Sequence, residues 1–168
     1  MEQSADSIET YKVSNAPSAE SGLLAPLIVE KPWGREEWIV YNESYVMKLL
    51  YVTRGESLSK QYHEEKMETL KLLEGKCNVI FGHEGDLERD VRVFTMDSRD
   101  NIALHINPRT IHRFEAIEDS LFVEVSTPQV GDVVRLEDRY NRPTYDDVVC
   151  LEDRYNRPAT HELEQQVK

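Results

Sequence analysis

The feature that most constrains the fold is a long succession of short apolar segments separated by turn residues. Between residues 37 and 126, segments rich in β-branched, aromatic and leucine residues alternate with turn signals such as Glu74-Gly75 and Asn107-Pro108. Many short strands at regular spacing are typical of a β-sandwich or barrel. No long helical period occurs before residue 130, which argues against a doubly wound α/β fold. The fold class is therefore predicted to be all-β, with strands at Glu37–Val40, Tyr45–Thr53, Leu58–Gln61, Thr69–Leu73, Cys77–Phe81, Val91–Thr95, Ile102–Ile106, Ile111–Phe114 and Leu121–Val125.

The two ends of the chain differ from this central region. Residues 1–27 are rich in Ser, Glu and Ala without a clear apolar period, and they are predicted to form a flexible N-terminal arm. Order is expected to begin near Leu27-Ile28-Val29, so that residues 28–143 form one domain. Residues 144–168 are predicted to be a polar, peripheral C-terminal tail.

An internal repeat spans the end of the domain and the tail. Asp132–Pro143 reads DVVRLEDRYNRP and Asp147–Pro158 reads DVVCLEDRYNRP, so that only Arg135 and Cys150 differ. A solenoid needs at least three repeats to bury a core, and two copies are too few. We therefore expect a local duplication with one copy docked and the other peripheral, although the sequence does not say which copy docks.

Composition restricts the partners and the compartment. The formal net charge is −12, which argues against a nucleic-acid binder, although a local basic spot can still hold one phosphate group. The chain shows neither a secretory signal nor a run of about 20 apolar residues that would cross a membrane. We therefore expect a cytoplasmic protein that does not bind membranes and whose two cysteines, Cys77 and Cys150, are free thiols.

The strongest chemical signal is the pattern Gly55-x5-Gln61-x-His63-x4-Glu68-x6-Gly75. Gln61 and His63 are two residues apart, so that on a strand both side chains face the same side. The polar residues that follow can turn the chain, after which Glu68 opens the next strand and can point back to the same spot. Gly55 and Gly75 fall where tight turns need a permissive backbone.

A second histidine, His112, lies about 50 residues further on and can complete this cluster from a neighbouring strand. Two oxygens and two imidazole nitrogens suit one divalent metal, with zinc preferred and iron, manganese, cobalt or nickel as alternatives that add water ligands. A coordination position left open to a sugar hydroxyl would permit Lewis-acid catalysis. The predicted metal ligands are Gln61, His63, Glu68 and His112.

Three separated motifs resemble the cupin superfamily, and within it the type II mannose-6-phosphate isomerase module. Lys31-Pro32-Trp33-Gly34 resembles the Arg-Pro-Trp-Gly start of that family, and Gly55-Glu56-Ser57-Leu58-Ser59-Lys60-Gln61-Tyr62-His63 resembles its metal-binding motif. Asp132-Val133-Val134-Arg135-Leu136-Glu137-Asp138-Arg139-Tyr140 is similar to its closing motif. The resemblance covers about residues 28–143 and implies a double-stranded β-helix (a cupin jelly-roll barrel) with a metal inside. It further implies aldose–ketose interconversion of a phosphorylated sugar such as mannose 6-phosphate.

The surroundings of the metal ligands depart from that family. The family typically continues with His-His-His-Arg-Ala-Glu-His-Trp, whereas this chain has His63-Glu64-Glu65-Lys66-Met67-Glu68-Thr69-Leu70. Lys66, Arg109 and Arg113 are candidate contacts for a substrate anion. Lys66, Glu65 and Arg113 are candidate catalytic residues, with Glu65 as a possible base. The 168 residues contain no counterpart of the guanylyltransferase domain that accompanies the module in bacteria, so nucleotide transfer is not expected.

Three functions follow from these observations. The first is a metal-dependent sugar-phosphate isomerase. The second is a non-catalytic cupin that binds a sugar or sugar nucleotide, or a regulatory partner of a sugar-nucleotide enzyme, because altered neighbours change a metal site strongly. The third is another metal chemistry such as oxygenation, against which Gln61 counts because those sites are usually richer in histidine. Because cupins commonly pair through an edge strand, we also expect a homodimer.

Overall fold

The computed structural model describes residues 13–15, 21–83 and 91–142, and these residues form strands joined by short turns. None of them belongs to an α-helix, and Ser98–Asp100 forms a single 3-10 turn (η3). The strands are β1 (Val13–Asn15), β2 (Leu23–Ala25), β3 (Leu27–Lys31), β4 (Gly34–Tyr41), β5 (Val46–Val52), β6 (Lys60–His63), β7 (Glu68–Glu74), β8 (Lys76–His83), β9 (Arg92–Asp97), β10 (Ala103–Ile106), β11 (Thr110–Ala116), β12 (Ser120–Ser126) and β13 (Val133–Glu137).

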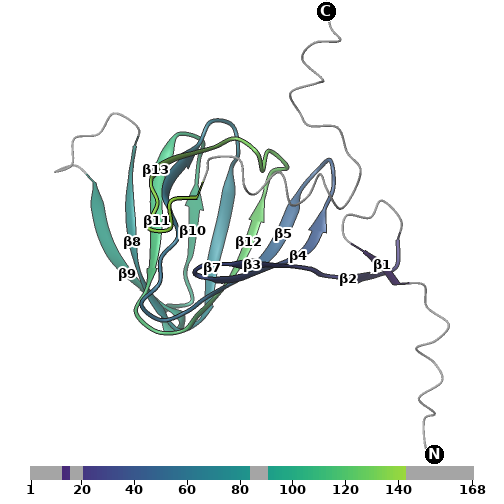
Figure 1. The fold of residues 1–168 in the computed structure, drawn as a ribbon, viewed down its shortest axis with the longest axis horizontal. Helices are drawn as coiled ribbons and strands as arrows, with labels where there is room; N and C mark the ends of the chain where they lie inside the picture. The colour runs from purple at the N-terminus through teal and green to yellow at the C-terminus, as the bar shows by residue number, and fades with distance from the viewer. Residues whose placement is uncertain (1–12, 16–20, 84–90, 143–168) are drawn as a thin grey trace, which may run out of the picture.

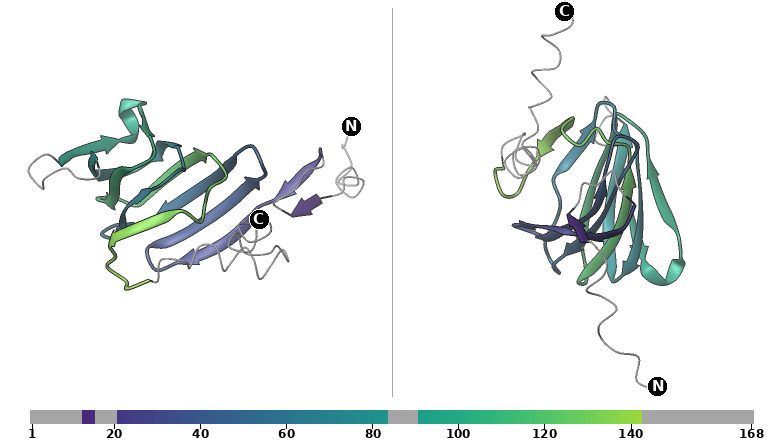
Figure 2. Two further views of the ribbon diagram at one scale, coloured as in Figure 1. Left: turned by 90° about the horizontal axis from the view of Figure 1, so that it is seen from above. Right: turned by 90° about the vertical axis from the view of Figure 1, so that its right-hand side faces the viewer.

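Two antiparallel sheets make up the domain (Figure 1). The six-stranded sheet has the order β10-β7-β12-β5-β4-β3, and the five-stranded sheet has the order β13-β6-β11-β8-β9. Strands that are distant in sequence are neighbours in both sheets, because β12 lies between β5 and β7 while β11 lies between β6 and β8. The two sheets face each other as the walls of a barrel (Figure 2). This arrangement confirms the predicted all-β fold with a double-stranded β-helix.

The core lies between the sheets and follows from the alternation of residues along each strand. In β5 the residues alternate strictly between buried and half-buried positions, so that one face of the strand points into the barrel. The ring of Phe114 on β11 meets the ring of Phe122 on β12 edge to face, with the ring centroids 5.3 Å apart. This contact joins the two sheets, and Trp33, in the turn between β3 and β4, packs into the same core.

Every predicted strand between residues 37 and 126 has a counterpart in the structure. The largest shift concerns the segment predicted at Leu58–Gln61, since β6 pairs over Lys60–His63 and so includes His63 itself. β13 belongs to the first copy of the repeat and pairs with β6, so this copy docks on the five-stranded sheet. The second copy lies outside the described residues.

The predicted N-terminal arm contains two described strands. β1 and β2 pair in parallel, with Val13 opposite Leu23. The domain boundary at residue 28 stays a prediction. None of the described residues forms a helix that is long and apolar enough to cross a membrane. Cys77 is a buried free thiol, in agreement with the sequence, and Cys150 lies outside the described residues.

We predict that the two motif glycines differ in how much they tolerate a methyl group. Gly55 has φ +82° and Gly75 has φ +85°, but only at Gly75 would a Cβ atom overlap the carbonyl oxygen of Asp119. Gly55→Ala is expected to lower the free energy of unfolding by about 1–2 kcal/mol through backbone strain alone. Gly75→Ala adds overpacking and is expected to lower it by about 2–5 kcal/mol. Urea denaturation of both variants measures the difference, and equal losses would contradict the packing at Gly75.

Candidate metal centre

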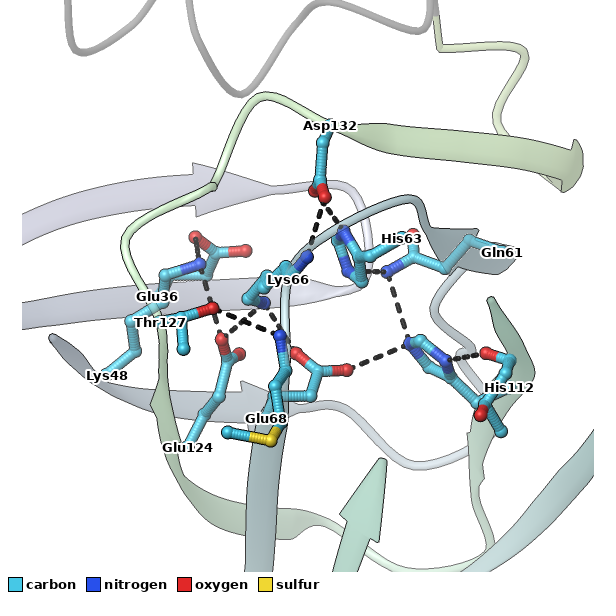
Figure 3. A network of polar contacts seen from close by, with 12 residues as sticks. Glu36, Lys48, Gln61, His63, Lys66, Glu68, His112, Glu124, Thr127 and Asp132 are labelled. Atoms are coloured by element: carbon cyan, nitrogen blue, oxygen red, sulfur yellow. Dashed lines mark hydrogen bonds and ion pairs between the residues drawn. The ribbon is translucent and has the colours of Figure 1, made fainter. Parts of the chain in front are cut away.

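The four predicted ligands converge between the two sheets. Gln61 and His63 come from β6, His112 from β11 and Glu68 from the start of β7 (Figure 3). Ligand atoms of His63, Glu68 and His112 all lie within 4.8 Å of one another, and all three residues are buried. His112 Nε2 is 3.1 Å from Glu68 Oε1. The structure thus brings together a group that the sequence could place only by strand periodicity.

Strand pairing explains this convergence. Gln61 lies directly opposite His112 across the antiparallel pair β6 and β11, and His63 follows on the same face of β6. The loop after His63 carries the chain across to the six-stranded sheet, where Glu68 begins β7. Glu68 therefore faces the other three predicted ligands from the opposite wall of the barrel.

The ring nitrogens of both histidines are oriented by hydrogen bonds on the side away from the centre. His63 Nδ1 donates to Asp132 Oδ1 over 2.8 Å, and His112 Nδ1 donates to the carbonyl oxygen of Thr110 over 2.9 Å. These two acceptors assign a proton to each Nδ1, so that the Nε2 of each ring faces the centre. Such partners are the usual support of a metal-binding imidazole.

Electrostatics keeps His63 in its metal-binding form. Burial lowers the pKa of His63, and the nearby charge of Lys66 lowers it further, which together outweigh the opposing hydrogen bond to Asp132. The neutral imidazole is the form that binds a metal. Asp132 is itself held in place because its Oδ2 accepts the backbone N–H groups of Glu65 and Lys66, each over 2.7 Å.

Of the four predicted ligands, Gln61 is the one that presents an amide nitrogen rather than a ligand atom to the two histidines. Its Nε2 atom lies 3.5 Å from the Nε2 atom of each histidine, and its Oε1 accepts a hydrogen bond of 2.6 Å from Ser59 Oγ. A half turn of the amide would present the oxygen to a metal. The Ser59 hydroxyl could then accept from the amide nitrogen, since a hydroxyl both donates and accepts. Two imidazoles, one carboxylate and one amide oxygen fit a divalent ion.

A buried ammonium group adjoins these ligands. Lys66 is 4% exposed, and its Nζ lies 2.5 Å from Glu68 Oε2 and 2.7 Å from Glu124 Oε1. Burial alone would lower the pKa of Lys66, but the two carboxylates outweigh burial and raise that pKa above its usual value. The charge of Lys66 holds the pKa of Glu68 well below its usual value, and the charges of Lys48 and Lys66 hold the pKa of Glu124 below its usual value. Lys66 is therefore a cation at neutral pH.

The charges continue as a row across the six-stranded sheet. Glu124 on β12 lies opposite Lys48 on β5, with 3.8 Å between Lys48 Nζ and Glu124 Oε1. Lys48 Nζ is also 3.9 Å from Glu36 Oε2 on β4, and Trp38 Nε1 donates to the same oxygen over 2.8 Å. We call Glu36, Lys48, Glu124, Lys66 and Glu68 the charge row. Every member is less than 9% exposed, so that these pairs are scarcely screened by water.

A small cavity of about 50 Å³ lies between the charge row and the predicted ligands. This volume accommodates a metal ion and a few water molecules. Two arginines that were not predicted as site residues, Arg135 and Arg142, also line it. Other side chains on its wall are Trp33, Ser59, Gln61, His63, His112 and Phe114, together with the charge row.

Three other predicted site residues do not line the cavity. Because neighbouring residues on a strand face opposite sides, Arg113 points outward where His112 points inward, and its Nη1 lies 3.2 Å from Glu137 Oε2. Arg109 is exposed and lies 3.7 Å from Glu64. Glu65 is also exposed. Of the residues predicted for catalysis or anion binding, Lys66 is the one that reaches the cavity.

Asp132 and most of the charge row were not predicted as site residues, although the sequence contains one signal for the charge row. Lys48 falls in the inward phase of β5, where Val46, Leu50 and Val52 are buried. Glu124 falls in the same phase as Phe122 on β12. A charged residue in the buried phase of a strand indicates either a partner charge or a site. No local alternation of buried and exposed residues indicated Asp132, because its contact with His63 depends on how β13 pairs with β6.

The chain resembles a known protein family. The family described as "Mannose-6-phosphate isomerase C-terminal" matches residues 25–140. None of the curated protein sequences matches the chain. The match to the family covers all four predicted ligands and β13.

Solved structures share the fold at low identity. The capsular polysaccharide assembling protein CapF from Staphylococcus aureus superposes with a TM-score of 0.57 and 17% identity over 68% of this chain, which spans 33% of CapF. Oxalate decarboxylase from Lactobacillus farciminis, in a formate complex, gives 0.55 and 15% over 83% of this chain and 41% of that chain. KdgF from Halomonas sp. gives 0.50 and 17% over 61% and 86%. At these identities the similarity establishes the fold alone.

We predict that Asp132 tunes metal affinity without touching the metal. Asp132→Asn weakens the acceptor for His63 Nδ1–H and should lower affinity for Zn²⁺ by about 10–100-fold. Asp119→Asn is a matched control, because Asp119 also accepts a backbone N–H, that of Arg54, whereas Asp132 in addition bonds the ring of His63. Competition titration with a chelator measures both variants. Equal affinities in the two variants would contradict the role of Asp132.

We also predict that the charge row stabilises the protein in a pH-dependent way. Glu124→Gln leaves Lys48 and Lys66 short of a buried partner and should lower the free energy of unfolding of the metal-free protein by about 3–5 kcal/mol at pH 7. The folded-state pKa of Glu124 lies below its unfolded value, so its contribution is present above about pH 4.3 and is lost as the pH falls through the folded-state pKa. The difference in the free energy of unfolding between wild type and Glu124→Gln should therefore decrease below pH 4.

Glu64→Gln serves as the control for this measurement. Glu64 pairs with Arg109 across 3.7 Å, but both side chains are about half exposed. Such surface pairs contribute about 0–1 kcal/mol. Denaturant titrations from pH 3 to pH 7 compare the variants, and a gap that stays constant over this range would overturn the role assigned to Glu124.

Proposed function

The chain belongs to the mannose-6-phosphate isomerase C-terminal family of cupins, and from this membership we propose that it is a metal-dependent isomerase of a phosphorylated sugar. The observation that carries the proposal is the buried meeting of two imidazoles, both with Nε2 facing inward, and Glu68. This donor set fits a divalent ion, and it faces a cation, Lys66, that is held within hydrogen-bonding distance of one ligand. A homodimer, which the sequence predicts, is part of this proposal.

Aldose–ketose interconversion needs positive charge beside two neighbouring sugar oxygens. It also needs a group that moves a proton between the two carbons that carry these oxygens. An ion held by Gln61, His63, Glu68 and His112 would supply the first charge when bound. Lys66 is fixed beside the same place, and its ammonium group can stabilise the negative charge that develops on an enediolate oxygen. Since Lys66 stays protonated at neutral pH, it acts as a cation or proton donor rather than as a base.

The proton acceptor must also line the cavity. Glu65 is exposed and does not line it, whereas Glu124 does. We therefore assign proton transfer to the hydrogen-bonded pair of Glu124 and Lys66, which share a contact of 2.7 Å. The role assigned to Glu65 from the sequence is replaced by this pair in the proposal.

One observation favours a second candidate, a non-catalytic cupin that binds a sugar or sugar nucleotide. The cavity of about 50 Å³ is far smaller than the pockets of about 300–1,000 Å³ that usually enclose small molecules. An isomerase must therefore widen the mouth of the barrel for the sugar. A binding cupin could keep the metal and charge row as a rigid support and recognise its ligand at the mouth alone.

We predict that the protein loaded with one divalent ion per chain converts mannose 6-phosphate into fructose 6-phosphate. Lys66→Met, assayed with the metal supplied in excess, should lower kcat by at least about 100-fold, because loss of positioned charge acts on the transition state. Lys71→Met is the matched control, because Lys71 lies on β7 and bonds outward to Asn101. Nuclear magnetic resonance of the sugar mixture follows the conversion.

The result also separates the two candidates. Conversion that depends on His63, His112 and Lys66 supports the isomerase. A wild-type protein that binds the metal but converts neither sugar phosphate with zinc, iron, manganese, cobalt or nickel contradicts it and leaves the binding cupin. Loss of metal in His63→Ala and His112→Ala is expected in both cases.

A further inference from the structure

We propose that the indole N–H group of Trp33 donates a hydrogen bond to an oxygen of the sugar that binds at the candidate metal centre. The inference rests on the proposed function, because it assigns a binding residue to the end of the sugar that enters the cavity. Trp33 belongs to the motif Lys31-Pro32-Trp33-Gly34 but was not predicted as a site residue, and it lines the cavity in the structure.

The position of Trp33 is fixed by the turn between β3 and β4. Its carbonyl oxygen accepts the backbone N–H of Thr53 over 2.9 Å, which ties the turn to the residue that follows β5. Gly34, with φ +143°, permits this approach, because a Cβ atom there would overlap the carbonyl oxygen of Tyr51. The side chain of Trp33 is 2% exposed and packs into the core. The fold therefore holds the indole ring in place before any ligand binds.

The indole N–H of Trp33 has no hydrogen-bond acceptor among the described residues. Buried polar groups rarely lack a partner, because an unpaired donor gives up its hydrogen bond to water without a replacement. Trp38 shows the usual case, since it is equally buried and its Nε1 donates to Glu36 Oε2 over 2.8 Å. The unpaired donor of Trp33 therefore indicates an acceptor that binds beside it, either a water molecule or a ligand.

Trp33 differs from the other buried side chains that contain an unpaired atom. In the described part of the chain these other atoms are Arg113 Nε, Arg135 Nε and Ser126 Oγ. Both arginines also take part in ion pairs, and Ser126 does not line the cavity. The indole ring has a single polar atom, which can only donate. Of these four residues, Trp33 is thus the one that lines the cavity with its sole polar atom unpaired.

The surroundings of Trp33 on the cavity wall favour a sugar as the source of the acceptor. Leu50, Leu58, Leu70 and Phe114 line the cavity together with Trp33, and all of them belong to or pack against the same core cluster. This part of the wall is therefore apolar apart from the indole N–H, whereas the predicted ligands and the charge row form the polar part. A sugar combines apolar C–H groups with hydroxyl or carbonyl oxygens, and an apolar wall with few placed donors is typical of sites for such molecules.

The chemistry of the indole group restricts which part of the sugar it binds. Its N–H pairs with a hydroxyl or carbonyl oxygen but not with the ammonium group of an amino sugar, which has no lone pair to accept it. A ligand without an oxygen at this place would leave the donor unpaired again and would bind more weakly. Trp33 therefore acts in binding and specificity, whereas proton transfer stays with Glu124 and Lys66.

Nuclear magnetic resonance tests this role without any need for catalysis. The chain contains two tryptophans, Trp33 and Trp38, so that the isotope-labelled protein gives two indole N–H signals, and Trp33→Phe assigns them by removing one. Mannose 6-phosphate added to the zinc-loaded full chain should shift the Trp33 signal downfield, as a new hydrogen bond does. The Trp38 signal should stay in place, because its N–H is already bonded to Glu36. A Trp33 signal that does not move at saturating sugar phosphate overturns the role and leaves water as the acceptor.

Calorimetric titration with the same sugar phosphate measures what the hydrogen bond contributes. Trp33→Phe should weaken binding by about 2–10-fold, because one hydrogen bond between uncharged groups is lost, while the affinity for Zn²⁺ stays as in wild type. Leu50→Val is the matched control, because it also reduces the apolar wall but removes no donor. Equal losses in the two variants would assign the effect to packing and contradict the role of the indole N–H.

These results also separate the role of Trp33 from the proposed isomerase. If the Trp33 signal shifts and Trp33→Phe binds mannose 6-phosphate more weakly, but the wild type does not convert it, the role of Trp33 stands and the isomerase fails. If the wild type converts the sugar phosphate with an unchanged Trp33 signal, and Trp33→Phe keeps the same KM, the isomerase stands and the role of Trp33 fails. A wild type that neither binds nor converts mannose 6-phosphate overturns both.

Discussion

The buried ammonium group of Lys66 is the interaction on which the rest of the site depends. Removing an ion from water costs several kcal/mol, and only close partners of opposite charge offset that cost. Glu68 and Glu124 provide them from β7 and β12, while Lys48 extends the row to β5. A slip of one residue between these strands would turn a charge out of the row and leave its partner buried alone. The charge row therefore specifies the register of the sheet as well as the electrostatics of the cavity.

The same interaction orients a metal ligand. Glu68 uses one carboxylate oxygen for Lys66 and presents the other to His112. On the opposite wall, Asp132 does the equivalent for His63 by fixing its tautomer. The centre is thus held from both sheets by groups that do not themselves belong to the predicted ligand set. Such outer contacts commonly decide how tightly and how selectively a metal is bound.

Local sequence patterns were sufficient to predict the strands and the proximity of Gln61, His63 and Glu68. Gln61 and His63 share a face because they are two residues apart, and Glu68 follows after one turn, so short-range spacing placed them correctly. What the sequence did not reveal depends on pairing between distant strands. The burial of Lys66 could not be predicted from its neighbours in sequence, because its partner Glu124 lies 58 residues away along the chain. The positions of Arg135 and Asp132 likewise depend on β13 lying beside β6.

These long separations have a consequence for how the protein acquires its centre. His63 and Asp132 are 69 residues apart, and Gln61 and His112 are 51 apart. Contacts of such high sequence separation form late, because the entropy of closing the intervening loops must first be overcome. During synthesis, β6 and β7 emerge with an incomplete ligand set well before β11 and β13 exist. Because His112 lies on β11 and Asp132 just before β13, we expect the candidate metal centre to form late in folding rather than to act as its nucleus.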